Sequence, residues 1–425
     1  MKHLFTLLFL SLCMGVAPAF AQEEESHDIA LENVTVSRVS KRGSALTVKG
    51  TMCNRGTAVA QNPMIRYTLN DDTPQRKLNS CKIEQGEKFN FSFTVPTKSV
   101  TEDGIATLKL ELAWRDGSVD DNPDDNNVTL ETYLTSAAPN HRMVCEEGTG
   151  SWCGWCVKGI VGMKKMSEKY GERFIPIAAH TNAEKDPLAN EVYEKWITDV
   201  MGITSYPTCW VNREPTGRNP NFTYIEPYMT AMPAYADFDI SVTADITDEV
   251  FDMTAHVTPL LAPEMSNYHI VFAITEDGLP GTQQNFYFDG NSGEMGGFEK
   301  LPMYVDLIYE FVARGMWPGP EDRDLTAFKL PKDMQPGTTY DVNFCLSTAD
   351  VPHSDLASCS VIAMLIDTKT AQVVNAHKFD PAQQSGIHTV LAERNSRSER
   401  YNLSGQRISR QQSGIGIEQG KKVMR

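Results

Sequence analysis

The sequence has few basic residues for its length. Its 425 residues include 39 lysines and arginines against 55 aspartates and glutamates, which gives a formal net charge of −16. Nucleic-acid phosphates are bound by basic surfaces, so this deficit argues against a nucleic-acid partner. The deficit is uneven, because residues 393–425 carry eight basic and three acidic side chains. The rest of the chain is therefore more acidic than the total indicates.

The sequence also lacks a long apolar run. A membrane-spanning helix needs about 20 apolar residues, and the best candidate, residues 4–16, is shorter than that. This run follows Lys2 and precedes the small-x-small pattern of residues 19–21, which together predict a signal peptide over residues 1–21. Lipoprotein processing at Cys13 is an alternative. We expect an exported protein without a transmembrane segment, in the periplasm, the outer membrane or at the cell surface.

Cysteines are few, but their number is even once the signal peptide is removed. The sequence has nine, and Cys13 lies in the signal peptide. In an oxidising compartment, disulfides are the default interpretation of the other eight. These eight candidates form three groups, which suggests three modules: Cys53 and Cys81; Cys145, Cys153, Cys156 and Cys209; Cys345 and Cys359.

Two regions, residues 28–137 and 236–382, have the pattern of β-strands. Short runs such as residues 89–95 alternate apolar and polar side chains and are bounded by Gly, Asn and Asp. This pattern predicts two antiparallel β-sandwich domains, the second with a helical insert near residues 304–313. The first region loosely resembles the immunoglobulin-like modules of bacterial surface proteins.

The region between them, residues 138–235, alternates helix-period and strand-like segments. Apolar residues recur at helical spacing over residues 157–170, and strand-like runs follow at residues 174–179 and 208–211. Such alternation predicts an α/β domain. Residues 383–425 have the composition of a linker and tail.

An acidic loop at residues 116–127 is a weak metal candidate. It is rich in Asp and Asn, but it does not follow the ligand order of an EF-hand. Because acidic turns are commonly only solvated, we predict no metal, with calcium at this loop as an alternative.

A Cys-x-x-Cys pair is the motif that carries chemistry. Cys153 and Cys156 directly precede the helix-period segment. A helix N-terminus stabilises a thiolate, so Cys153 is predicted to attack and Cys156, one turn along, to resolve the mixed disulfide. A zinc site would require a second such pair, which the sequence lacks. A permanently oxidised structural disulfide remains an alternative.

Two further residues fit a redox site. Pro207 precedes the strand-like run at residue 208, where a cis-proline would leave backbone groups to hold an extended substrate. Glu147 lies six residues before Cys153, and a buried carboxylate there would have a raised pKa and could move protons for the resolving thiol. An ordinary trans-proline and a solvated glutamate are the alternatives.

These elements resemble the thioredoxin superfamily, and within it the thioredoxin-like outer membrane proteins of Bacteroidetes. The resemblance rests on residues 146–156 (EEGTGSWCGWC), on Tyr206-Pro207-Thr208 and on Val211-Asn212-Arg213. It implies a central thioredoxin-like domain, with the nucleophile role at Cys153, the resolving role at Cys156, the cis-proline at Pro207 and the acidic role at Glu147. It also implies neighbouring strands that would allow a Cys145–Cys209 disulfide.

The tail resembles the C-terminal sorting signals of the type IX secretion system. The resemblance rests on residues 401–407 and 420–423 and on the basic charge of the terminus. It implies secretion machinery as a partner, although a simple basic tail is an alternative.

The sequence as a whole predicts a thiol–disulfide oxidoreductase without a cofactor, acting on protein thiols and disulfides. A surface binding protein or adhesin, with the central domain as scaffold, is the alternative.

Overall fold

The computed structural model describes residues 25–263, 267–290 and 292–381, together with the backbone of four short strands beyond residue 399. The predicted signal peptide and Cys13 lie outside the described residues. The chain divides into two compact units, one formed by residues 1–36, 45–99 and 106–132 and the other by the remaining residues. In the described part, no helix is long and apolar enough to cross a membrane.

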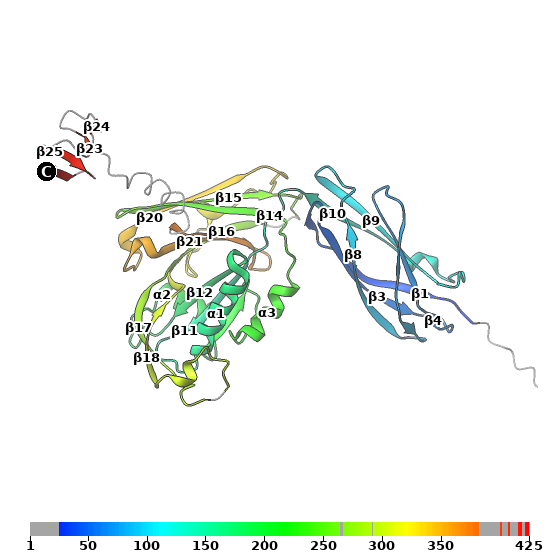
Figure 1. The fold of residues 1–425 in the computed structure, drawn as a ribbon, viewed down its shortest axis with the longest axis horizontal. Coiled ribbons are helices and arrows are strands. Elements are labelled where there is room, and N and C mark those ends of the chain that lie inside the picture. The colour runs from blue at the N-terminus through cyan, green and yellow to red at the C-terminus, as the bar shows by residue number, and fades with distance from the viewer. Residues whose placement is uncertain are drawn as a thin grey trace, which may run out of the picture. The chain divides into compact units, whose positions relative to one another are not determined.

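The first unit is built from β-strands, as predicted for residues 28–137 (Figure 1). Strand β8 shows why this sequence forms a sheet: its alternating pattern buries Phe91, Phe93 and Val95 and exposes the residues between them. One sheet has the order β1-β3-β8, formed by Ile29–Thr35, Ala45–Asn54 and Lys88–Pro96. The second includes the run β10-β9-β5-β6, formed by Asn127–Thr135, Gly104–Ala113, Met64–Leu69 and Gln75–Leu78. A short pair, β4 (Ala60–Gln61) and β7 (Lys82–Ile83), completes the set.

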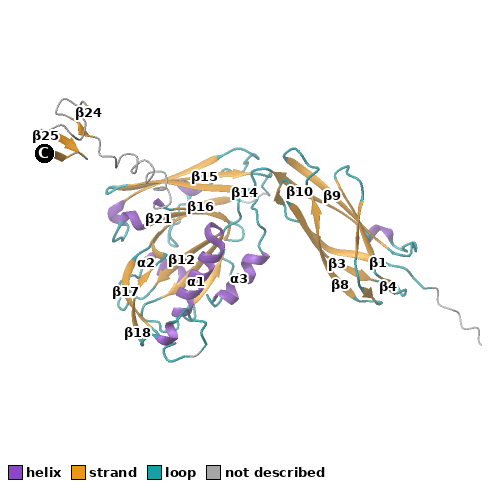
Figure 2. Cartoon of the chain, viewed as in Figure 1, coloured by secondary structure: helices purple, strands orange, loops and turns teal. Residues whose placement is uncertain are grey.

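The second unit is organised around a seven-stranded mixed sheet. Its order is β13-β11-β12-β19-β16-β21-β22, formed by Thr208–Val211, Met143–Thr149, Phe174–His180, Val312–Trp317, Tyr268–Glu276, Cys359–Asp367 and Gln372–Phe379. Strands β11 and β12 are parallel and are connected through helix α1 (Val157–Tyr170), whereas β13 is antiparallel to β11. The unit also contains helices α2 (Glu191–Lys195) and α3 (Phe222–Ala231), and α2 continues into a π-helical turn over Trp196–Val200 (Figure 2).

One sheet thus crosses the domain boundary predicted at residue 236. Strands β11, β12 and β13 come from the predicted residues 138–235, and the other four strands come from residues 236–382. The junction is the parallel pairing of β12 with β19, at Ala178 and Val312. The two predicted domains therefore share a sheet, and the described structure has two compact units where the sequence predicted three domains.

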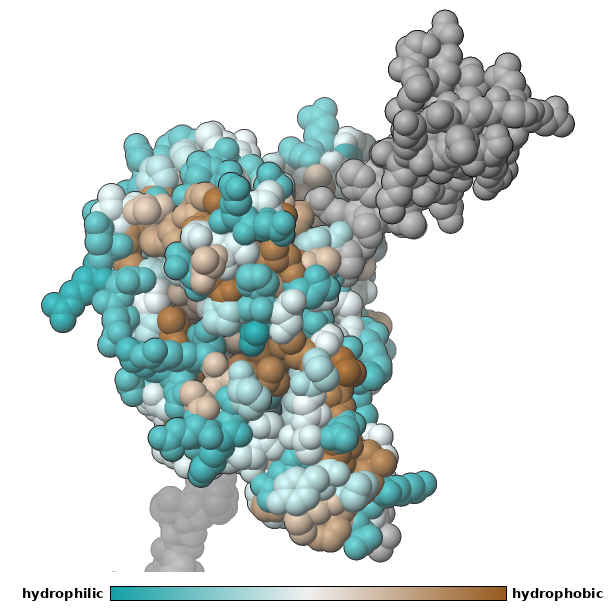
Figure 3. All heavy atoms as spheres, turned by 90° about the vertical axis from the view of Figure 1, so that its left-hand side faces the viewer, coloured by the Kyte–Doolittle hydropathy of each residue, from teal (hydrophilic) through white to brown (hydrophobic). Residues whose placement is uncertain are grey.

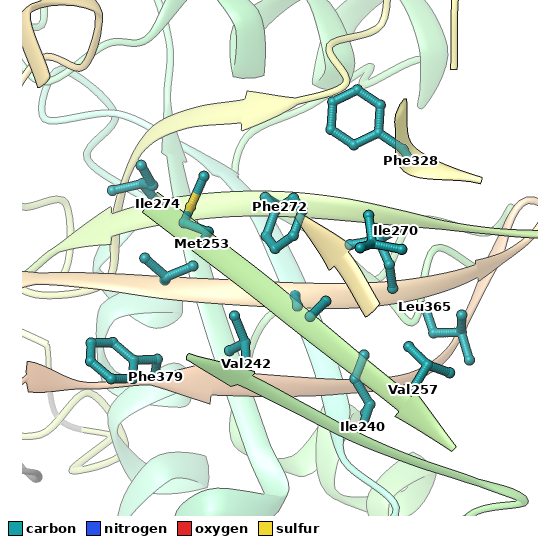
Figure 4. Packing of buried hydrophobic residues seen from close by; sticks show 14 of the residues in the cluster. Ile240, Val242, Met253, Val257, Ile270, Phe272, Ile274, Phe328, Leu365 and Phe379 are labelled. Carbon is teal, nitrogen blue, oxygen red and sulfur yellow. The ribbon is translucent and has the colours of Figure 1, made fainter. Parts of the chain in front are cut away.

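The β-sandwich of the second unit is held by a large apolar core (Figure 4). A three-stranded sheet, β14-β15-β20, packs its apolar side chains on those of β16 and β21; its strands are Phe238–Ile246, Val250–Pro259 and Tyr340–Ser347. Phe251, Met253 and Phe272 are among the fully buried members. Burying one such side chain contributes roughly 1.5–3 kcal/mol.

The helix predicted near residues 304–313 is wrong. This segment forms β18 (Tyr304–Tyr309), which pairs antiparallel with β17 (Leu279–Gln284), and then enters β19. Val305 and Tyr309 are buried while Tyr304 and Ile308 are exposed, so the burial alternates along the strand. We call the β17–β18 hairpin the arm.

The C-terminal region contains four short strands. They form a sheet of order β24-β23-β25-β26, from Arg407–Ile408, Arg400–Tyr401, Ile415–Glu418 and Lys421–Met424. The predicted tail therefore includes paired backbone, and the residues between these strands lie outside the described part.

Candidate redox site

Cys153 and Cys156 form a disulfide at the start of α1. Their Cα atoms lie 5.3 Å apart, and Cys156 is the residue that caps the helix. The amide of Cys156 donates to the Cys153 carbonyl (3.0 Å), so both cysteines lie in one tight turn. Cys156 is fully buried and Cys153 is 6% exposed. Of the two cysteines, only Cys153 retains some exposure, and both lie at a helix N-terminus, a position that in general favours a thiolate.

Glu147 lies within β11, two residues before its end, and packs against Gly159 in α1. Its side chain is buried, and Oε1 has no hydrogen-bond partner. Burial raises the pKa of Glu147 to about 8, an effect that a hydrogen bond with Thr149 opposes. Gly159 leaves the space for this carboxyl group, because a β-carbon there would lie 1.7 Å from Oε1. The buried carboxyl with a raised pKa that the sequence predicted is thus present.

Pro207 follows a cis peptide bond and directly precedes β13. The preceding Tyr206 contacts Trp152 edge-on, with ring centroids 5.2 Å apart. Trp152 in turn donates from Nε1 to the carbonyl of Thr181 (3.0 Å). The 206–207 segment therefore lies beside the residue that precedes Cys153.

A buried ion pair joins β11 to the end of β13. Arg213 binds Glu146 through two hydrogen bonds of 2.8 Å, and both side chains are buried. The ring of Trp196 stacks on the guanidinium, with Cζ 4.1 Å from the ring centroid. The Glu146 and Arg213 positions of the sequence motif therefore act together in fixing these two strands.

The sequence did not identify His180 and Asp186, which form a buried pair beside the motif. Nδ1 of His180 lies 2.7 Å from Oδ2 of Asp186, and the same oxygen accepts the amide of Ser151 (2.6 Å). Burial opposes ionisation of Asp186, but these hydrogen bonds and one from the Leu188 amide leave its pKa lowered. In the sequence, this pair could have been suspected from a histidine at the end of an apolar strand-like run and an aspartate six residues later.

The arm also supplies residues that sequence reasoning missed. Trp155, between the two cysteines, is 51% exposed and contacts Phe286 and Tyr287 edge-on, each with ring centroids 5.4 Å apart. The amide of Phe286 donates a hydrogen bond to the carbonyl of Gly154 (3.0 Å), and the Phe286 ring covers the Gly154 Cα.

Other exposed apolar side chains lie on the arm and its loop: Phe288, Leu301, Met303, Tyr304 and Ile308. Figure 3 views the side of the molecule that carries the arm and shows apolar patches between polar ones.

A cavity of about 490 Å³ lies between α1 and the arm. Glu147, Thr149 and His180 contribute its sheet side, Tyr309 belongs to the arm, and Lys164 comes from α1. The cavity gives the otherwise buried Glu147 a space adjoining solvent.

The other predicted disulfides are not formed. In the described part the six remaining candidates are free thiols, namely Cys53, Cys81, Cys145, Cys209, Cys345 and Cys359, so the Cys145–Cys209 disulfide that the resemblance implied is not formed. Cys145 and Cys209 are buried neighbours on β11 and β13; burial, together with their mutual hydrogen bond, raises the pKa of the Cys145 thiol. They pack with methionines of α1 as apolar core residues.

The acidic loop of the first unit brings several carboxylates close together. Carboxylates of Asp28, Asp120 and Asp125 lie within 4.8 Å of one another. Arg55 pairs with Asp125, and Asp120 accepts hydrogen bonds from the amide of Ile29 and the indole of its neighbour Trp114. These donors compensate only part of the negative charge, because Oδ1 of Asp28 and Oδ1 of Asp125 have no hydrogen-bond partner among the described residues. Calcium at this loop remains the alternative.

No protein-family model and no curated protein matches the sequence. Among solved structures, HBP35 of Porphyromonas gingivalis is 14% identical, covering 67% of this chain and 97% of its own, with a TM-score of 0.41. A CARDB domain from Pyrococcus furiosus is 15% identical, covering 26% of this chain and 98% of its own, with a TM-score of 0.23. A protein from Agrobacterium tumefaciens is 13% identical, covering 58% and 96%, with a TM-score of 0.37. At these scores the similarities assign no function.

Proposed function

We propose that the chain is a thioredoxin-like thiol–disulfide oxidoreductase that exchanges disulfides with protein substrates. The observation that carries the proposal is the Cys153–Cys156 disulfide at the start of α1, a helix that packs at Gly159 on the buried carboxyl of Glu147. The parallel β11–α1–β12 unit, the antiparallel β13 and the cis-Pro207 before it support the thioredoxin-like assignment. The resemblance of the motif supports it as well.

In the oxidising direction, a substrate thiolate attacks Sγ of Cys153, the cysteine of the pair that retains some exposure. A substrate–Cys153 disulfide forms, the Cys153–Cys156 bond breaks, and Cys156 leaves as a thiolate. Glu147, protonated near neutral pH because its pKa is raised to about 8, can supply the proton that Cys156 takes up. A second substrate thiolate then releases the substrate disulfide and the Cys153 thiolate. The reverse sequence reduces a substrate disulfide, with Glu147 accepting the proton of Cys156.

The proposed location is the cell envelope or surface. The signal-peptide pattern of residues 1–21 supports export, and the sorting-signal resemblance of the tail supports recognition by secretion machinery. Export would bring the disulfide to a compartment in which protein thiols are oxidised.

An insulin-reduction assay combined with thiol titration tests the proposed activity. We expect the wild type to cycle between disulfide and dithiol and Cys153→Ser to lose turnover. Cys156→Ser should accumulate a mixed disulfide with the substrate, detectable by mass spectrometry. Cys345→Ser is the matched control, because Cys345 is an exposed free thiol on β20. Equal turnover in the wild type and Cys153→Ser contradicts the proposal.

A binding protein or adhesin, with the disulfide as part of a scaffold, is the second candidate. The exposed aromatic group around Trp155 and the small exposure of Cys153 favour it. Under this alternative, the Cys153→Ser/Cys156→Ser variant keeps its binding to envelope or host proteins, and the wild type shows no turnover of insulin.

A further inference from the structure

The strand that leads out of the arm runs beside the disulfide turn. The amide of Gln284, the last residue of β17, donates to the carbonyl of Ser151 (2.8 Å), and just past the strand the amide of Phe286 donates to that of Gly154 (3.0 Å). Two backbone carbonyls of the turn are therefore held by a segment about 130 residues later in the chain.

The side chain of Gln283 fills the space between these two bonds. It is 1% exposed, and its Nε2 donates to the carbonyl of Cys153 (2.9 Å), with a longer contact to that of Gly150 (3.4 Å). It also donates to the carbonyl of Gln284 (2.9 Å). Tyr309 fixes the other end, because its hydroxyl donates to Oε1 of Gln283 (3.0 Å).

The same turn is held from the opposite side by the buried pair already described. Oδ2 of Asp186 accepts the amide of Ser151, and His180, its partner, contacts the ring of Tyr309 edge-on (5.1 Å). The backbone between Gly150 and Cys156 is thus bonded both to β12 and its loop and to the arm.

We infer that Gln283 is a positioning residue for the redox couple: by holding the Cys153 carbonyl, it favours the disulfide over the dithiol. The inference rests on the proposed thiol–disulfide exchange. A disulfide requires its two sulfurs at bonding distance, whereas two thiols do not, so a fixed turn raises the effective concentration of one cysteine at the other. The amide of Gln283 points at a carbonyl oxygen rather than at sulfur, so it gives the thiolate no comparable stabilisation.

Gln283→Met tests this inference, because methionine keeps the volume of the side chain and removes its amide. The full chain is equilibrated with reduced and oxidised glutathione, and the Cys153–Cys156 state is read by alkylation and mass spectrometry. Loss of one hydrogen bond predicts that the equilibrium constant for disulfide formation falls about fivefold. This corresponds to a potential about 20 mV less negative, since tenfold is about 30 mV for two electrons.

Thr282→Val is the matched control. Thr282 is adjacent to Gln283 and exposed, and its hydroxyl donates to Asp306 across the arm, so the variant loses a hydrogen bond that does not reach the turn. Its potential should equal that of the wild type. A second test variant, Tyr309→Phe, should shift the potential in the same direction as Gln283→Met and by a smaller amount.

The outcomes separate this inference from the proposed function. A wild-type protein that does not cycle with insulin overturns the proposed function, whatever the glutathione result. If the wild type cycles but Gln283→Met and Tyr309→Phe leave the potential unchanged, the inference is wrong, even if both variants unfold at lower temperature. Should Gln283→Met not fold, the potential of Tyr309→Phe decides the matter.

Discussion

Gly159 and Glu147 pack so closely that a β-carbon on Gly159 would lie 1.7 Å from Oε1 of the carboxyl group. Gly159 belongs to α1, three residues after Cys156, and its amide donates to the Cys156 carbonyl (2.9 Å). The helix that carries the disulfide therefore rests directly on the buried acid. Gly159 and Glu147 thus connect β11 to the helix that begins at the disulfide.

Gly159→Ala should destabilise the protein, although alanine ordinarily stabilises a helix interior by about 1 kcal/mol relative to glycine. The added methyl group would have to displace the carboxyl of Glu147, and such overpacking costs roughly 1–3 kcal/mol. Urea unfolding measures the change. In a Glu147→Ala background the same substitution should cost less, and a stabilising effect in the wild-type background would contradict the packing described.

Glu147→Gln should change how stability depends on pH. Glu147 has its pKa raised from 4.5 to about 8 by burial, so between these values the folded state keeps a proton that the unfolded state has lost. This contribution to stability is complete below pH 4.5 and is lost as the pH rises through 8. Relative to the wild type, Glu147→Gln should therefore gain stability between pH 5 and pH 8, on the order of 3 kcal/mol. Urea unfolding at both pH values gives the difference, and a constant difference would show that the carboxyl is not buried.

The local part of the site could be predicted from the sequence because its elements are adjacent in the chain. Cys153, Cys156 and Glu147 lie within ten residues, and the apolar spacing after residue 156 predicts the helix that places them. The strand-like runs around the motif likewise predict β11, β12 and β13. The apolar periodicity within each of these segments determines whether it forms a helix or a strand, so these elements can be predicted from the local sequence.

The remainder depends on pairings between distant segments. Strand β19 enters the sheet beside β12 through the Ala178–Val312 pair, and no local pattern specifies that partner. The hydrogen bond from Gln283 to the Cys153 carbonyl likewise joins residues 130 positions apart, so no local pattern predicts it. The wrong helix prediction at residues 304–313 has a local cause. Val305, Leu307 and Tyr309 alternate as in a strand, but the apolar residues Val312 and Ala313 continue the apolar pattern past Tyr309, where β18 ends.

Arg213→Met should be strongly destabilising. It leaves Glu146 as a buried carboxylate without its bidentate partner, and breaking a buried ion pair in this way costs about 3–5 kcal/mol. Replacing both partners, as in Glu146→Leu/Arg213→Met, should restore part of the loss. Lys82→Met is the comparison at the exposed pair with Glu84, where we expect a change of about 1 kcal/mol or less. Equal effects at the two pairs would contradict the burial of Glu146.

Trp155→Ala should weaken the use of protein substrates more than the chemistry of the disulfide. The indole is half exposed and is held between Phe286 and Tyr287, so it offers an ordered apolar surface next to Cys153. Aromatic side chains in such positions contribute disproportionately to protein binding. We expect KM for insulin to rise roughly tenfold, equivalent to about 1.4 kcal/mol, with the rate of reduction by glutathione changed less than about twofold. Tyr224→Ala, at an exposed aromatic residue of α3, is the control and should leave both unchanged. A fall in both rates by the same factor would instead assign Trp155 to the chemistry of the disulfide, because substrate binding alone cannot slow reaction with a small thiol.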